Sequence, residues 1–94
     1  MTVLRQRMLE DLQLHGLSAN TQKVYLRAVR LLAEHYGKSP DQISVEELRT
    51  YFLYLQNEKG SARSTIMVAL CGIKFFYQRT LRQHWPLLDL VRPG

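Results

Sequence analysis

The stretch GLSANTQKVYLRAVRLL, residues 16 to 32, contains a helix start, an apolar stripe and a row of cations. Ser18 suits the N-cap position, because its hydroxyl can accept a hydrogen bond from a backbone amide two or three residues later. Gly37 is a natural helix stop. Between them the apolar residues recur at the spacing of an amphipathic helix, at Tyr25, Ala28, Val29, Leu32 and Tyr36. The stretch therefore predicts a helix over residues 18–36.

Three cations, Lys23, Arg27 and Arg30, belong to the same predicted helix. Successive residues of an α-helix turn by about 100°, which places these cations together on the face opposite the apolar stripe. Such a row faces either water or the phosphates of a nucleic acid. The rest of the chain is needed to choose between the two.

Two further helices are predicted on either side of this one. Within residues 3–15 an apolar side chain recurs every four residues, and Gly16 follows as a stop. Ser44 and Glu47 have the spacing of a capping box, which predicts a helix over residues 45–58. The inner positions of the helix over residues 3–15 are Leu4, Met8 and Leu12. Those of the helix over residues 45–58, the third along the chain, are Val45, Leu48, Phe52 and Leu55.

A fourth helix is predicted over residues 63–81, with inner positions at Ile66, Ala69, Leu70, Ile73, Phe76 and Tyr77. Its outer positions are small or apolar, namely Ser64, Val68, Cys71, Gly72 and Phe75. They indicate either a contact surface or burial against the first helix. The segment PLLDLV at residues 86–91 predicts either a short fifth helix or a connector. The expected fold class is all-α, a compact bundle of four main helices.

The composition fits one small domain without a recognisable catalytic or metal-binding site. With 94 residues, 46% of them hydrophobic, the chain can bury a single modest core. Its one cysteine, Cys71, can form no internal disulfide and is expected to be a buried or half-buried structural thiol. The three histidines are predicted at helix ends without ligand spacing. We therefore expect no metal, no cofactor and no catalytic residues, so the chain is not expected to be an enzyme.

The sequence also predicts where the chain is found. No apolar run is long enough to cross a bilayer, and no signal peptide precedes the first helix. A cytoplasmic protein without a membrane partner is expected.

Charge is segregated along the chain. Lysine and arginine total 13 against 8 acidic residues, a net charge of +5. The predicted helices over 18–36 and 63–81 are basic, and the helix over 45–58 is acidic, which is typical of an electrostatic footprint on DNA. Both basic helices start with short hydroxyl side chains, in LSANT and SARST, beside free backbone amides that bind phosphates. These features favour a nucleic acid as partner, and cations that only face water stay open as the alternative.

Three segments taken in order, LSANTQKVYLRAVRLLAEHYG, ISVEELRTYFLYLQNEKG and SARSTIMVALCGIKFFYQRTL, resemble the N-terminal SAM-like, or core-binding, domain of tyrosine recombinases and phage-type integrases. The residues HWPLL and the RP after them look most similar to integron- and transposon-type integrases. In this family the core-binding domain forms one arm of a clamp around duplex DNA. The catalytic domain forms the other arm and carries the tyrosine nucleophile.

The resemblance implies a domain that binds the recombination site and has no catalytic residues of its own. We expect residues 1–84 to be this domain and residues 85–94 to be a connector toward an absent catalytic domain. The implied partners are double-stranded DNA, the catalytic domain of the same protein and other protomers assembled on DNA. As an isolated domain the chain is expected to be a monomer.

The resemblance also implies which residues contact DNA. Those of the second helix are Asn20, Thr21, Lys23, Val24, Arg27 and Arg30, and those of the fourth are Arg63, Ser64, Thr65, Val68 and Lys74. Val68 and Gly72 depart from the family pattern, because neither side chain can hydrogen-bond a base edge and Val68 could touch only a thymine methyl group. We therefore expect mostly phosphate contacts and modest sequence specificity.

Two other functions stay open from the sequence. One is a helical protein–protein interaction module without a DNA role, which would use the apolar outer residues Leu53, Tyr54 and Phe75. The other is a small enzyme, which the missing site chemistry disfavours.

Overall fold

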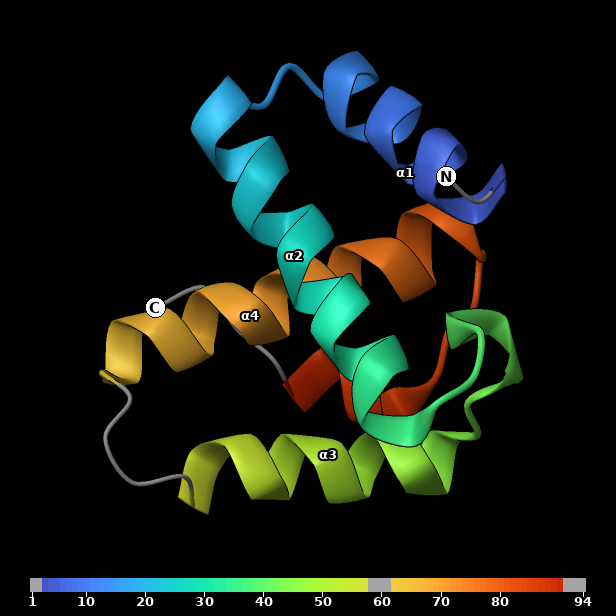
Figure 1. The fold of residues 1–94 in the computed structure, drawn as a ribbon, viewed down its shortest axis with the longest axis vertical. Helices are drawn as coiled ribbons and strands as arrows, with labels where there is room; N and C mark the ends of the chain where they lie inside the picture. The colour runs from blue at the N-terminus through green and yellow to red at the C-terminus, as the bar shows by residue number, and fades with distance from the viewer. Residues whose placement is uncertain (1–2, 58–61, 91–94) are drawn as a thin grey trace.

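The computed structural model describes residues 3–57 and 62–90. The predicted end of the third helix at residue 58, the first residue of the SARST start and the last four residues of the predicted connector lie outside them. The elements are α1 Val3–Leu14, α2 Ala19–Tyr36, η1 Pro40–Gln42, α3 Val45–Asn57, α4 Arg63–Phe75, η2 Phe76–Thr80 and η3 Pro86–Leu90 (Figure 1). All are helical, and the described residues include no strand, which confirms the all-α fold class.

Local hydrogen bonds begin and end the helices close to the predicted positions. The Thr21 amide donates to the Ser18 hydroxyl at 3.2 Å and caps α2, which Gly37 ends in the left-handed region at φ 65°. The predicted capping box starts α3. The Glu47 amide donates to the Ser44 hydroxyl at 3.2 Å, and the Ser44 amide donates to the Glu47 carboxylate at 3.0 Å.

The central contact of the fold is the crossing of α2 over α4 (Figure 1). Gly72 lies at this crossing, where an added Cβ would stand 3.0 Å from the Cα of Tyr25. Gly72 is buried, so its prediction as an outer residue of the fourth helix is wrong. The reason is that α2 passes over this side of α4 and needs a residue without a side chain there.

The core collects side chains from every α-helix and from the C-terminal segment. The residues with 0% exposure are Leu12, Leu32, Leu48, Ile73, Tyr77 and Leu88. Leu26 and Tyr51 are buried although they lie off the predicted stripes, whereas Tyr25, Tyr36 and Leu55 are only half-buried. Leu26 is buried because α2 has neighbours on two sides, α1 and η1 on one and α4 on the other, which widens its apolar arc.

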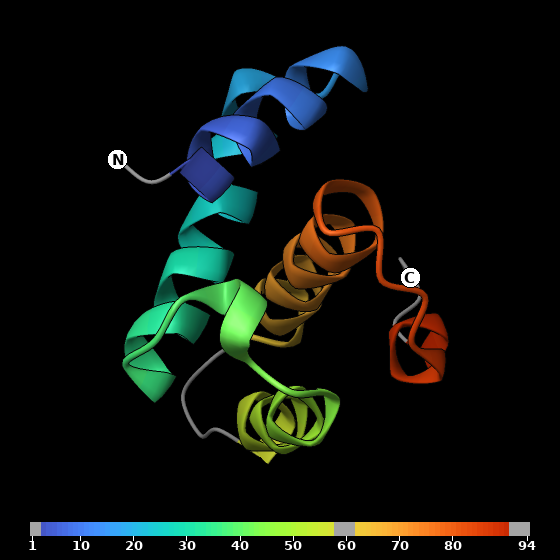
Figure 2. The same ribbon diagram turned by 90° about the vertical axis from the view of Figure 1, so that its right-hand side faces the viewer.

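The fourth predicted helix is interrupted near its end. The α-helix ends at Phe75, and the chain continues as the single π-helical turn η2. Thr80 Oγ1 in this turn donates to Asp11 Oδ2 at 2.8 Å and so connects η2 to α1. The segment predicted as a short helix or connector forms the 3-10 helix η3, which lies on the side of α4 opposite α2 (Figure 2). Its Leu88 is fully buried in the core.

Candidate nucleic-acid interface

The first two-thirds of α2 and the N-terminal half of α4 line an open groove of about 660 Å³. The two helices pack closely at Gly72 and diverge toward their starts (Figure 1). Most of the residues predicted to contact DNA line the groove, namely Asn20, Thr21, Val24 and Arg27 from α2 and Ser64, Thr65 and Val68 from α4. The fold therefore brings together residues that are about 40 positions apart in the sequence.

The starts of the two helices present different polar groups to this groove. At α2 the Ser18 hydroxyl accepts from the Thr21 amide and donates to the Thr21 hydroxyl at 2.9 Å, so part of the helix start is already capped. At α4 the N-cap residue is Ala62, which makes no side-chain cap bond. The side chain of Ala62 therefore caps none of the first-turn amides of α4, which lie beside the exposed hydroxyls of Ser64 and Thr65.

The cations of α2 are all exposed, but they do not share one groove. Arg27 lines the groove toward α4. Arg30 lines a separate groove formed with α1 and η1, and its Nε lies 3.8 Å from Glu34 Oε2. Both partners of this ion pair are more than half exposed, so the pair is weak. Lys23 stands on the helix crest between the two arginines.

The two predicted cations of α4 lie away from the α2–α4 groove. Arg63 is exposed and Lys74 is half-buried, and neither lines it. Lys74 lies near Cys71. Burial raises the pKa of the Cys71 thiol, and the Lys74 charge partly offsets this shift. Cys71 is thus the half-buried thiol that the sequence predicted.

Four groove residues were not predicted as contact residues, namely Tyr25, Ala28, Leu31 and Ala69. Tyr25 and the two alanines form the floor, where burial raises the pKa of the Tyr25 hydroxyl. Leu31 is 41% exposed and stands two helical turns after Val24. This seven-residue spacing was the signal in the sequence that could have identified it.

The groove contains no acidic side chain among the described residues that line it. The acidic residue of α2, Glu34, lines a different groove with Tyr54 and His35. The α2–α4 groove therefore combines one arginine, several hydroxyl and amide groups and a helix start, all of which favour an anionic ligand.

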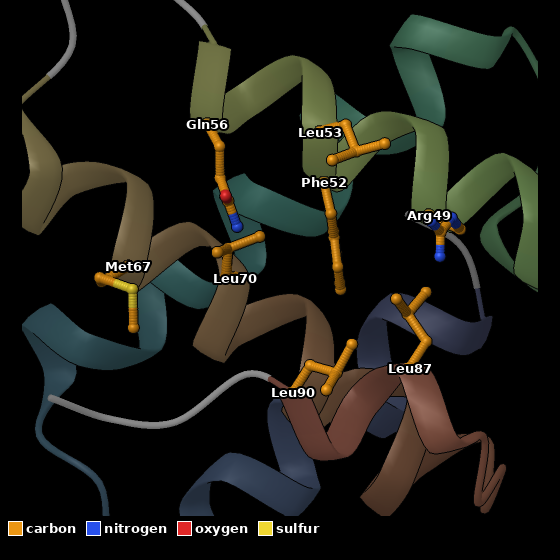
Figure 3. Close-up of a pocket in the computed structure, with 8 residues that line it drawn as sticks. All are labelled: Arg49, Phe52, Leu53, Gln56, Met67, Leu70, Leu87 and Leu90. Carbon is orange, nitrogen blue, oxygen red and sulfur yellow. The ribbon is translucent and has the colours of Figure 1, made fainter.

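Another groove, of about 240 Å³, lies between α3, α4 and η3 (Figure 3). Its lining is mostly apolar, and Leu87 and Leu90 of η3 point toward α3 in this view. Leu53 and Leu90 are 50% and 74% exposed. The three residues predicted for a protein-binding patch do not share one surface, and only Leu53 lines this groove. The Tyr54 ring packs on the His35 ring with their centroids 5.0 Å apart. The half-buried Phe75 ring packs on the His15 ring with their centroids 5.2 Å apart.

The described residues contain neither a cluster of metal ligands nor a membrane-spanning helix. No three histidine, cysteine, aspartate or glutamate side chains there come together as a metal site. No helix in residues 3–57 or 62–90 has the length and apolar character to span a bilayer.

Comparison with known proteins gives two kinds of match. Residues 4–87 match the family model described as phage integrase, N-terminal SAM-like domain. In Sinorhizobium fredii (strain NBRC 101917 / NGR234), the protein named "Putative integrase/recombinase y4qK" is 49% identical over 85 residues, which cover 90% of this chain and 28% of that protein. The protein named "Putative integrase/recombinase y4eF" from the same strain is 45% identical over 40 residues, 43% of this chain and 16% of that protein.

The chain thus spans little more than a quarter of the length of the relative that it matches over 85 residues. No solved structure matches the chain.

Proposed function

Because the chain belongs to the family of N-terminal SAM-like domains of phage integrases, we propose that it holds double-stranded DNA at the recombination site of a tyrosine recombinase. The family expected from the residue pattern is confirmed by the match over residues 4–87. The observation that carries the proposal is the convergence of residues from α2 and α4 in one groove without an acidic side chain among its described lining residues.

In this proposal the residues in the groove and the cations around it have different roles. Arg27 and the starts of both helices bind phosphates, because a guanidinium and free helix-start amides stabilise negative charge. Lys23 and Arg30 contact phosphates on either side of the helix crest. Arg63 and Lys74 extend the basic surface along α4. The domain itself supplies binding and orientation, and strand cleavage belongs to a catalytic domain elsewhere in the full-length protein.

The proposal also covers the organisation of the longer protein. Residues 1–84 are proposed as the DNA-holding unit and residues 85–94 as the connector to the catalytic domain, with the first part of the connector packed on the core through Leu88. Other protomers join only on DNA, and the isolated domain is a monomer.

Removal of single arginines tests the DNA-binding proposal. Arg27→Ala is expected to weaken binding to every duplex sequence and to lower the slope of log affinity against log salt by about 1, because one phosphate contact is lost. Arg30→Ala is expected to have a smaller effect in the same direction, since Glu34 already partly neutralises it. The measurement is fluorescence anisotropy of a labelled duplex at several salt concentrations.

The matched control is Arg49→Ala, which removes an exposed arginine of α3 that lines the groove of Figure 3 instead. It is expected to leave the affinity and its salt slope nearly unchanged. An Arg27→Ala chain that binds duplex DNA with unaltered affinity and slope would refute the assignment of the groove.

Binding of a protein is a second candidate function, favoured by the two exposed leucines at the groove of Figure 3. If this were the main function, Leu53→Asp would abolish binding of the catalytic domain while Arg27→Ala would leave it intact. Pull-down of a separately expressed catalytic domain by the two variants distinguishes these outcomes.

A further inference from the structure

The α2–α4 groove presents three exposed aliphatic side chains beside its polar ones, and these three are called the aliphatic strip. Val24, Leu31 and Val68 all line the groove, and they are 36%, 41% and 37% exposed. They come from two helices that approach each other closely where Gly72 meets Tyr25, next to Val24. Large aliphatic side chains that remain in contact with water within one groove indicate a contact surface for a ligand with apolar groups.

Duplex DNA offers one base-specific apolar group in its major groove, the C5 methyl group of thymine. The side chains of valine and leucine carry no hydrogen-bonding atom, so contact with this methyl group is the base-specific interaction open to them. The polar groups that line the same groove can contact the phosphates of the DNA backbone. They are Thr21, Arg27, Ser64 and Thr65.

Asn20 adds a second preference in the same direction. It is exposed and precedes Val24 by four residues, so the two side chains share one face of α2. An asparagine amide can bond both N6 and N7 of adenine in the major groove. An adenine contact from Asn20 next to a thymine methyl contact from Val24 selects A·T pairs at neighbouring positions.

On the basis of the proposed DNA binding, we propose that Val24, Leu31 and Val68 read thymine methyl groups, so that the groove selects sites with thymines opposite this strip. Val24 and Leu31 are seven residues apart, or about 10 Å along α2, which spans at most about three base-pair steps. Each methyl group buried against the strip is expected to raise the affinity about fourfold. Several such contacts give specificity while phosphate contacts supply most of the affinity.

Replacement of thymine by deoxyuridine tests the proposal, because it removes the methyl group and keeps base pairing and charge. A duplex is first selected from a random library by the 94-residue chain, and then prepared with thymine or with deoxyuridine throughout. We expect the deoxyuridine duplex to bind at least fourfold more weakly. Val24→Ala and Val68→Ala are each expected to reduce this ratio.

The matched control is Leu53→Ala, which shortens an exposed leucine outside the groove and is expected to keep the full ratio. Circular dichroism of each variant shows that the fold is retained. A chain that binds no duplex overturns the proposed function and this inference together. A chain that binds thymine and deoxyuridine duplexes equally overturns only the methyl-reading inference, as does a ratio that every strip variant retains.

Discussion

At the scale of single residues, Gly72 has the largest structural effect on the groove. Its position at the α2–α4 crossing leaves 3.0 Å between an added Cβ and the backbone of Tyr25. Alanine would favour the helix by about 1 kcal/mol, but two helix backbones would have to separate. We expect Gly72→Ala to lower the free energy of unfolding by about 1–2 kcal/mol net, measured by urea denaturation.

The control for this prediction is Ser64→Ala in the same helix, at an exposed position. It is expected to change the free energy of unfolding by less than about 0.5 kcal/mol. If Gly72→Ala were as stable as the parent chain, the crossing would not be as tight as the structure indicates.

At the scale of elements, the start of α3 shows how local chemistry sets a helix. The Ser44 hydroxyl accepts from the Glu47 amide, and Lys38 Nζ donates to the Glu47 carboxylate at 2.8 Å. We expect Ser44→Ala to cost about 1 kcal/mol of unfolding free energy, because an amide of the first turn loses its acceptor. Thermal or urea unfolding measures this loss of stability. Thr50→Ala, which lies later in the same helix, is the comparison. Equal stability of Ser44→Ala and the parent chain would contradict this role of the cap.

The same carboxylate makes stability depend on pH. The hydrogen bond from Lys38, followed by that from the Ser44 amide, lowers the pKa of Glu47. Because the folded pKa lies below the unfolded one, the stabilisation is complete above the ordinary glutamate value of about 4.3 and is lost as the pH falls below it. Glu47→Gln is therefore expected to lose less stability than the parent chain between pH 6 and 3. Identical acid profiles in urea titrations would show that the carboxylate makes no such contribution.

At the scale of the whole molecule, η3 extends the core beyond residue 84. Leu88 has 0% exposure, whereas Leu90 in the same short helix is 74% exposed. We expect Leu88→Ala to lower the free energy of unfolding by about 2–5 kcal/mol, because it leaves a cavity in the core. Leu90→Ala is the control and is expected to cost less than about 0.5 kcal/mol. Similar urea midpoints for the two variants would mean that residues after 84 do not contribute to the core.

The sequence by itself determined the helices and the family. Ser18, Gly37 and the Ser44–Glu47 pair were predictable because caps are hydrogen bonds between residues three or four positions apart. The apolar spacing predicted the all-α class for a similar reason, since a helix repeats within a few residues. The order and spacing of the motifs was enough to identify the family that the match over residues 4–87 then confirmed.

Only the tertiary structure decided which residues share a groove. It placed Arg27 with Ser64 and Thr65, put Arg30 in a different groove and left Arg63 and Lys74 outside both. It also revealed Leu31 as part of the aliphatic strip. The physical reason is that the side of a helix that meets a neighbour depends on where the two helices cross. That crossing is set by long-range packing such as the contact of Gly72 with Tyr25, which no local pattern in either helix specifies.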